Sequence, residues 1–187
     1  MKMRKSVTFV TAGLVLAGII LGGGFVGTMA AESTTKDTAK EIALSDAGLS
    51  ENDVTFDDIE KGKEQGAAVY EIEFWTDTDE YEYDIAIADG EIVSVSREQT
   101  DPSPSGAEIS KSEAKGIALE HAGVKKDSVT FTKDSTGTED GISVFKFKFE
   151  DDDAKYEYNV TKEGGEILSY SKTIRTPACV SAGRKAK

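Results

Sequence analysis

The segment VYEIEF at residues 69–74 decides the fold, because from Tyr70 onward its side chains alternate between apolar and charged. Its alternate apolar residues Tyr70, Ile72 and Phe74 share one face of an extended chain, and the two glutamates between them point to the other. A second alternating run, YEYDIAI, follows at residues 81–87. Alternation of this kind predicts an antiparallel sheet with one apolar face and one solvated face.

The whole pattern returns 75 residues later without a gap. The strand segment 69–74 has its counterpart in VFKFKF at residues 144–149. The segment AKEIALSDAG at residues 39–48 has its counterpart in AKGIALEHAG at residues 114–123. About 24 of some 62 aligned positions are identical, where chance would leave only a few. The chain therefore contains a duplicated unit.

Each unit opens with a predicted helix. Apolar residues within 39–47 recur at helical spacing. Gly48 and Gly123 stand where a helix end favours a left-handed residue, and Ser110 and Glu113 have the spacing of a capping box. Because the apolar sheet face needs a cover, we expect an α+β fold of two tandem repeats, each with one helix packed on an antiparallel sheet of three to four strands. Whether the repeats dock on each other stays open, although a unit this small is near the lower size for independent folding.

Residues 1–30 read as a targeting segment that precedes both units. Basic residues at its start lead into an uncharged, apolar stretch at 7–26, and Thr28, Met29 and Ala30 form a motif suited to cleavage. The segment predicts export, with two alternatives: a signal peptide that is removed, or an uncleaved apolar leader helix that anchors the chain in the membrane. The basic residues would hold the N-terminus in the cytoplasm in either case.

The predicted layout has two repeats between an apolar leader and a basic tail. The linker between the repeats holds two of the three prolines, which favours an extended, solvated conformation. The tail is either a disordered end or a contact site for an anionic polymer or lipid through Arg184, Lys185 and Lys187. The boundaries are 1–30 for the signal peptide or anchor, 37–98 for the first repeat, 99–108 for the linker, 109–173 for the second repeat and 174–187 for the tail.

The composition argues against several classes of function. The 187 residues include 35 acidic and 22 basic side chains and carry a formal net charge of −13, which opposes nucleic-acid binding. One histidine and one cysteine are too few for most His-based catalytic sites and for an intrachain disulfide. We therefore expect no enzyme, with no catalytic, cofactor-binding or metal-binding residues.

The order of the segments resembles the PepSY family: AKxIALxxAG, then VxF, then VYEIEF, then YEYDI, then DGEIVS. The resemblance covers both repeats and involves core positions rather than a catalytic motif. The second repeat departs from it in one turn, where Gly164 precedes Gly165 in place of aspartate. The resemblance implies a small module without catalytic residues, found in propeptides of secreted thermolysin-like metallopeptidases and in bacterial envelope proteins. It also implies a role in binding and inhibiting peptidases, and it transfers no site residue.

Few residues are candidates for chemistry. His121 is expected near the end of the second helix, facing solvent and favoured by the helix dipole, because no motif supplies a nucleophile or orienting partner. Cys179 lies in the tail, either as an incidental residue or as a reactive or intermolecular thiol. The acidic runs at 77–80 and 150–153 are either solvated turns between strands or weak Ca²⁺ sites, although neither has the EF-hand pattern.

The solvated face of one strand changes sign between the repeats. Glu71 and Glu73 in the first repeat correspond to Lys146 and Lys148 in the second. The change is either neutral drift on an exposed face or a functional difference. In the second case the repeats would present opposite charges to each other or to separate partners.

Two functions fit these observations. The first is an extracytoplasmic protein, secreted or anchored by residues 1–30, that binds or inhibits a secreted metallopeptidase or another envelope protein. Its physical basis would be exposed strand edges that pair with a partner's main chain. The second is a structural or accessory cell-envelope protein with no peptidase target. A membrane is expected as a partner only through residues 1–30, and nucleic acid is not expected.

Overall fold

The first repeat is a helix followed by an antiparallel sheet. The computed structural model describes residues 33–175, so the predicted leader at 1–30 and residues 176–187 of the tail, with Cys179, lie outside the described residues. Within 33–175, neither helix has the length and apolar character needed to cross a membrane. The elements of the first repeat are α1 (Lys36–Ala47), the 3-10 turn η1 (Glu51–Asp53), β1 (Thr55–Phe56), β2 (Glu60–Glu64), β3 (Ala67–Trp75), β4 (Asp79–Ala86) and β5 (Ile92–Gln99).

The second repeat follows the same order and differs in its outer strand. There, β6 is continuous through a bulge between Phe131 and Lys133. In the first repeat, residues 57–59 divide the equivalent stretch into β1 and β2, which both pair with β3. The elements of the second repeat are α2 (Lys111–Ala122), η2 (Lys126–Ser128), β6 (Thr130–Glu139), β7 (Ile142–Glu150), β8 (Ala154–Thr161) and β9 (Ile167–Ile174).

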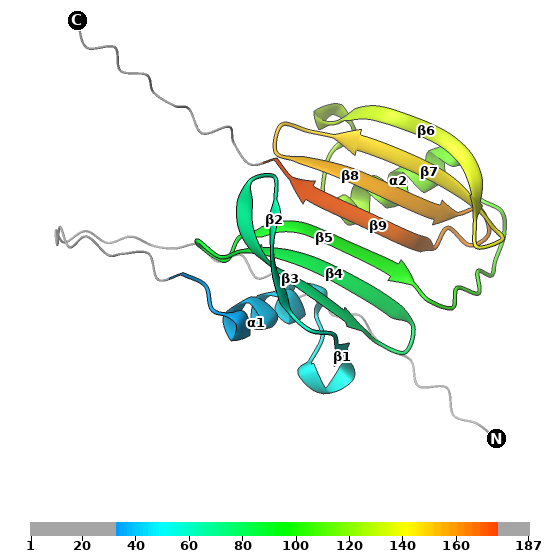
Figure 1. Cartoon of the computed structure of the whole chain (residues 1–187). Coiled ribbons are helices and arrows are strands. Elements are labelled where there is room, and N and C mark those ends of the chain that lie inside the picture. The colour runs from blue at the N-terminus through cyan, green and yellow to red at the C-terminus, as the bar shows by residue number, and fades with distance from the viewer. Residues whose placement is uncertain (1–32, 176–187) are drawn as a thin grey trace, which may run out of the picture. The chain divides into compact units, whose positions relative to one another are not determined.

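The two repeats share one nine-stranded sheet, because β5 pairs antiparallel with β9. The strand order is β1-β3-β4-β5-β9-β8-β7-β6, with β2 also beside β3, and Figure 1 shows β5 and β9 next to each other. The register places Arg97 opposite Tyr170 and Val95 opposite Lys172. Opposite residues of an antiparallel pair point to the same face. Since Val95 packs in the cluster under α1 and Tyr170 packs against the clusters under both helices, the two helices cover the same face of the sheet.

Local signals place the ends of both helices where the sequence predicts them. Ser110 and Glu113 form the capping box, in which the Ser110 backbone N–H donates to the Glu113 carboxylate at 2.8 Å. Gly48 and Gly123 end their helices in the left-handed conformation, with φ of 68° and 70°. The predicted helix starts and stops are therefore confirmed where a cap residue was named.

The core consists of two large apolar clusters, one beneath each helix, and a small third cluster of Val69, Ala86 and Val93 on the other face of the sheet. Small residues of each helix lie on aromatic residues of the sheet, and the alternation predicted for 69–74 is confirmed, with the apolar side chains buried and both glutamates exposed. Burying one such aromatic side chain contributes about 2–3 kcal/mol. The first cluster is built mainly from Ala39, Ala43, Leu44, Tyr70, Ile72, Phe74, Tyr83, Ile85 and Val95. The second is built mainly from Ala114, Ala118, Leu119, Phe145, Phe147, Phe149, Tyr156, Tyr158 and Val160.

The linker is fixed to the second repeat at its C-terminal end. Glu108 forms an isolated bridge with Glu163, and the Gly164 N–H donates to the Ala107 carbonyl oxygen at 3.0 Å. Gly164 has φ of 74°, and a Cβ there would lie 2.3 Å from the Ser105 carbonyl oxygen. The glycine that departs from the family pattern in this turn therefore leaves room for the linker backbone.

Candidate functional site

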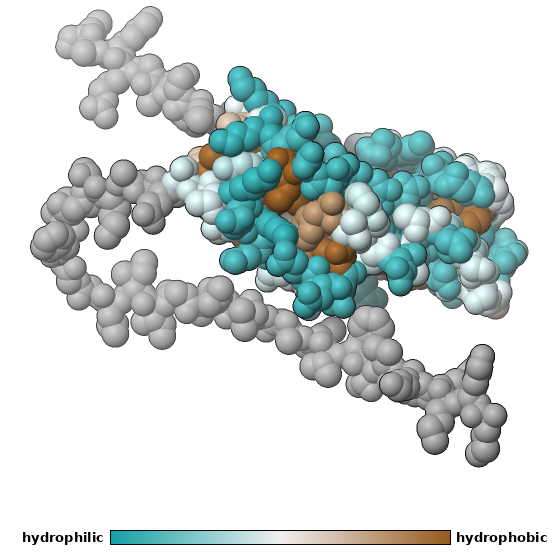
Figure 2. Space-filling model, turned by 60° about the horizontal axis from the view of Figure 1, so that its bottom comes forward, coloured by the Kyte–Doolittle hydropathy of each residue, from teal (hydrophilic) through white to brown (hydrophobic). Residues whose placement is uncertain are grey.

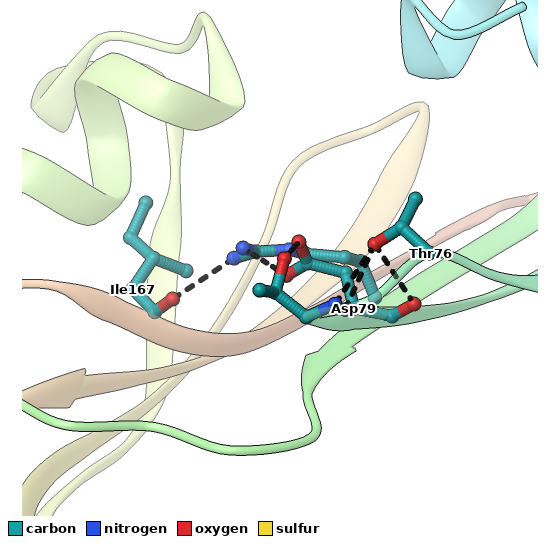
Figure 3. A network of polar contacts seen from close by, with 5 residues as sticks. Thr76, Asp79 and Ile167 are labelled. Atoms are coloured by element: carbon teal, nitrogen blue, oxygen red, sulfur yellow. Dashed lines mark hydrogen bonds and ion pairs between the residues drawn. The ribbon is translucent and has the colours of Figure 1, made fainter. Parts of the chain in front are cut away.

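A polar network at the junction of the repeats uses one residue of the first acidic run. Arg97 of β5 forms an ion pair with Asp79 of β4 and donates through Nη1 to the Ile167 carbonyl oxygen of β9 at 3.0 Å (Figure 3). The Thr76 hydroxyl oxygen accepts from the Asp79 N–H at 3.0 Å, and the Thr78 hydroxyl donates to the Asp79 carboxylate at 2.7 Å. The Arg97 and Asp79 side chains are only 20% and 14% exposed. The network therefore links the two repeats and leaves Asp79 engaged.

The two acidic runs lie between strands, as predicted, but part of each run belongs to a strand. β4 begins at Asp79 and β7 ends at Glu150. In the second run, Asp151 Oδ1 accepts from the backbone N–H groups of Asp153 at 2.9 Å and Ala154 at 2.7 Å, which closes the turn. Within residues 33–175, no three His, Cys, Asp or Glu side chains are grouped so that they could hold a metal ion.

His121 lies in the last turn of α2, as predicted, and is exposed, but it also makes a contact that its position in the sequence did not indicate. Its Nδ1 is 2.9 Å from the Tyr158 hydroxyl oxygen. The equivalent residue of the first repeat, Asp46, accepts from the Tyr83 hydroxyl at 2.9 Å. Although the residue as a whole is exposed, its ring packs against Tyr158 and Tyr170, and this burial, followed by the positive charge of Arg97, lowers the pKa of His121 below its ordinary value of 6.5, against the effect of the helix dipole. Each repeat therefore joins its helix end to a sheet tyrosine, with different chemistry.

Within residues 33–175, no helix covers the other face of the sheet, although a small cluster of Val69, Ala86 and Val93 is buried on it. In the first repeat this face carries carboxylates from four adjacent strands, and cross-strand pairing aligns them in rows. Like charges placed directly opposite each other destabilise a sheet. We call this surface the acidic face, and it consists of Glu60 and Glu64 of β2, Glu71 and Glu73 of β3, Glu80, Glu82 and Asp84 of β4, and Glu98 of β5.

The same face of the second repeat is balanced in charge. Lys146 pairs with Glu139, and Lys148 Nζ lies 2.5 Å from Glu157. The two lysines of the second repeat therefore form ion pairs, whereas Glu71 and Glu73 of the first repeat form none with the described residues. β3 and β7 are separated in the sheet by four other strands, β4, β5, β9 and β8. The repeats thus do not set these charges against each other, which corrects the interpretation in which they would.

The electrostatics of the acidic face disfavour full ionisation. Partial burial, followed by the neighbouring carboxylates of Glu64, Glu82 and Glu71, raises the pKa of Asp84 to about 6. Burial, followed by Glu80 and other nearby acids, also raises the pKa of Glu73. The surface therefore holds negative charge at neutral pH at the expense of stability.

Both outer edges of the sheet are free in the part of the chain that the structure describes. One edge is formed by β6 and the other by β1 and β2. In the view of Figure 2, hydrophilic residues cover most of the surface and hydrophobic residues appear in small, separate patches. On the face seen in Figure 2, contact with a partner would therefore depend on polar groups rather than on a broad apolar patch.

Comparison with known proteins finds one matching family. Residues 35–96 and 108–170 each match the family described as "Peptidase propeptide and YPEB domain" (PepSY). An uncharacterized protein, Spy1430, from Streptococcus pyogenes serotype M6 is 44% identical over 64 residues, which cover 34% of this chain and 49% of that protein. The matched region thus spans about half the length of that relative.

Two solved structures are similar at a lower level. The C-terminal domain of Bacillus megaterium YpeB is 20% identical with a TM-score of 0.45, and the match covers 74% of this chain and 63% of that one. A candidate lipoprotein from Clostridium difficile 630 is 17% identical with a TM-score of 0.30, covering 73% of this chain and 91% of that one. Similarity at this level carries no information about function.

Proposed function

Because this chain belongs to the PepSY family, with one matching region in each repeat, we propose that it is an exported, non-enzymatic binding protein that restrains a secreted or envelope peptidase. The family description names peptidase propeptides, which supports a peptidase as the partner. The observation that carries the proposal is the sheet itself: within residues 33–175, both outer edges lack a neighbouring strand and one face lacks a covering helix. Such a sheet offers surface for binding rather than reactive groups.

The β6 edge is the better prepared of the two edges for strand addition. It is continuous over Thr130–Glu139, whereas the opposite edge is interrupted between β1 and β2. Lys111 Nζ and Lys115 Nζ of α2 lie 3.0 and 2.5 Å from the carboxylate of Asp134, in the middle of β6. An edge that is held in place before binding loses less conformational entropy when a partner strand pairs with it.

The proposal is tested by adding the full-length chain to a thermolysin-like metallopeptidase and following hydrolysis of a fluorogenic peptide. We expect a saturable loss of activity. Replacing the exposed edge residues Thr136 and Thr138 by lysine should reduce that loss, because charged edge residues oppose strand addition. The matched control places lysine at Ser45 and Ser50, which are exposed near the end of α1, and should inhibit like the wild type.

Failure takes a clear form in this assay. Full peptidase activity at every excess of the chain, with no peptidase recovered by the immobilised chain, would contradict the proposal. The accessory envelope role without a peptidase target would then be the better description.

A further inference from the structure

The acidic face has no cationic partner among the described residues. No lysine or arginine within residues 33–175 forms an ion pair with any of its carboxylates, although seven ion pairs occur elsewhere in this part of the chain. The nearest lysines in the sheet are turned away. In β2, Glu60 is opposite Glu71 on the acidic face, whereas Lys61 is on the helix side, with its Nζ 5.4 Å from the centre of the Tyr70 ring.

An exposed tryptophan lies at one end of the acidic face. Trp75 follows Glu73 on the same side of β3 and is opposite Glu80 of β4. At 36% exposure it is the one large hydrophobic residue classed as exposed within residues 33–175. The equivalent residue of the second repeat is Glu150, which pairs with Arg175, so the fold itself does not require a tryptophan at this position.

A hollow lies on this surface, lined in part by Glu73, two residues before Trp75 in β3. Its volume is about 290 Å³, and carboxylates dominate its lining, with residues from the break between β1 and β2 and from β2, β3 and β4: Asp57, Asp58, Glu60, Glu71, Glu73 and Glu82 among them. The break between β1 and β2 therefore contributes two of these acidic residues. In the second repeat the equivalent positions are Thr132 and Lys133, within β6.

The shape of this surface selects the kind of cation. Neighbouring strands are about 4.8 Å apart, so four strands spread the carboxylates over about 14 Å. A single metal ion needs convergent oxygens at 2.0–2.6 Å, and no such group occurs within residues 33–175. An extended polypeptide with several separate positive charges matches these rows of carboxylates better than a single metal ion does. An indole ring also attracts ammonium and guanidinium groups and is frequent among residues that dominate binding energy.

We propose that the acidic face, with Trp75 as its aromatic anchor, binds a lysine- and arginine-rich polypeptide segment of a partner protein. Assigning that segment to a peptidase rests on the proposed function, whereas the charge complementarity does not. Burial, followed by the neighbouring carboxylates, raises the pKa values of Asp84 and Glu73, and binding would relieve the repulsion between these carboxylates. The two repeats then have separate roles, with a charged docking face in the first and a strand edge in the second.

The test uses Trp75 as its own probe, because it is the sole tryptophan of the chain. The full-length chain is titrated at low ionic strength with a peptide of five Lys-Ala repeats, and with five Ser-Ala repeats as the uncharged control. We expect a saturable change in tryptophan emission with the lysine peptide alone. Binding should weaken at least tenfold when the salt concentration is raised to about 0.5 M, since exposed charges are then screened.

The variants separate a local surface from overall charge. Glu71→Lys with Glu73→Lys introduces the residues that the second repeat carries at Lys146 and Lys148, so the strand tolerates them, and it should weaken binding about tenfold or more. Glu120→Lys with Asp127→Lys changes the net charge equally at exposed positions of α2 and η2 and should bind nearly as well as the wild type. Circular dichroism checks that each variant is folded. Because Trp75→Glu removes the fluorescent probe, calorimetry measures the binding of the lysine peptide to that variant.

Three results would overturn the proposal: no saturable binding of the lysine peptide at low salt, unchanged binding by the Glu71/Glu73 variant, or equal weakening in both charge variants. None of them bears on peptidase inhibition, which is measured separately. A chain that binds the lysine peptide but does not inhibit the peptidase would contradict the proposed function and leave the proposal for this surface intact.

Discussion

Replacing Asp84 by asparagine should stabilise the protein at pH 7. Asp84 lies in the middle of the acidic face, where burial and three neighbouring glutamates raise its pKa to about 6. The second repeat carries Asn159 at the equivalent position, where its Nδ2 donates to the Ser169 hydroxyl oxygen at 2.9 Å. Ser94 is the equivalent of Ser169 and is opposite Asp84. The substitution therefore removes a disfavoured charge and offers a hydrogen bond that the fold already uses.

The magnitude and sign follow from the shift in pKa. A rise from 3.8 to about 6 corresponds to about 3 kcal/mol at 1.36 kcal/mol per unit. Because Asp84 is about half exposed, solvent screening reduces the expected gain to about 1 kcal/mol. The folded state binds this proton more tightly than the unfolded state, so the stability it contributes is present below pH 3.8 and lost as pH rises through 6. The advantage of Asp84→Asn should therefore be near zero at pH 3.8, grow toward pH 6 and then level off.

The assay is urea unfolding of wild type and variant between pH 4 and pH 8, followed by the fluorescence of Trp75. The control is Glu41→Gln, which removes one exposed charge from α1 and should change the free energy of unfolding by less than about 0.5 kcal/mol. A variant that is no more stable than the wild type at pH 7 would refute the reasoning. So would a gain of the same size at every pH, since the benefit would then not come from the charge.

Three further predictions concern the junction, the linker and the leader. Arg97→Met should lower the free energy of unfolding by about 2–3 kcal/mol, because it leaves Asp79 without its ion pair and the Ile167 carbonyl without its donor. Arg97→Lys should lower it by less. Denaturant unfolding measures both variants, and a loss below about 0.5 kcal/mol for Arg97→Met would count against the network. Gly164→Ala should destabilise the protein by about 2 kcal/mol or more, because Gly164 has a positive φ and a Cβ there would clash with the Ser105 carbonyl oxygen. Gly116→Ala in α2, where the space around a Cβ is open, should stabilise the protein by about 0.5–1 kcal/mol. Equal melting temperatures for the two variants would show that linker packing does not matter. N-terminal sequencing of the exported protein should begin at Ala31 if the leader is cleaved, and an intact Met1 in the membrane fraction would identify an anchor instead.

Features that depend on neighbouring residues could be predicted from the sequence. The helix ends at Gly48 and Gly123 need one residue that tolerates a left-handed conformation, and the capping box needs two residues three positions apart. The strand at 69–74 needs only alternation. The family assignment was also accessible, because the repeat preserves the order and spacing of core positions, and the matches at 35–96 and 108–170 confirm it.

The contacts of particular side chains could not be predicted in the same way. Arg97 aligns with Lys172 in the second repeat and reads as an exposed basic residue, and its ion pair with Asp79 requires knowledge of the β4–β5 register. His121 was placed at the helix end, but its contact with Tyr158 depends on how α2 lies across the sheet. Nothing in a single strand indicates either partner, because each contact joins segments that are distant in the sequence.

By itself, the sequence determined the duplicated unit, the elements within it and the apolar side of each strand, because alternation, caps and turns are local properties of the chain. Only the tertiary structure decided that β5 pairs with β9, because backbone N–H and C=O groups at a strand edge are the same in every sequence and do not specify their partner. That pairing places both helices on one side of the sheet. The carboxylates of the first repeat come together on the other side through the pairing of β2, β3, β4 and β5. Whether charged residues form a surface or are scattered depends on which strands become neighbours.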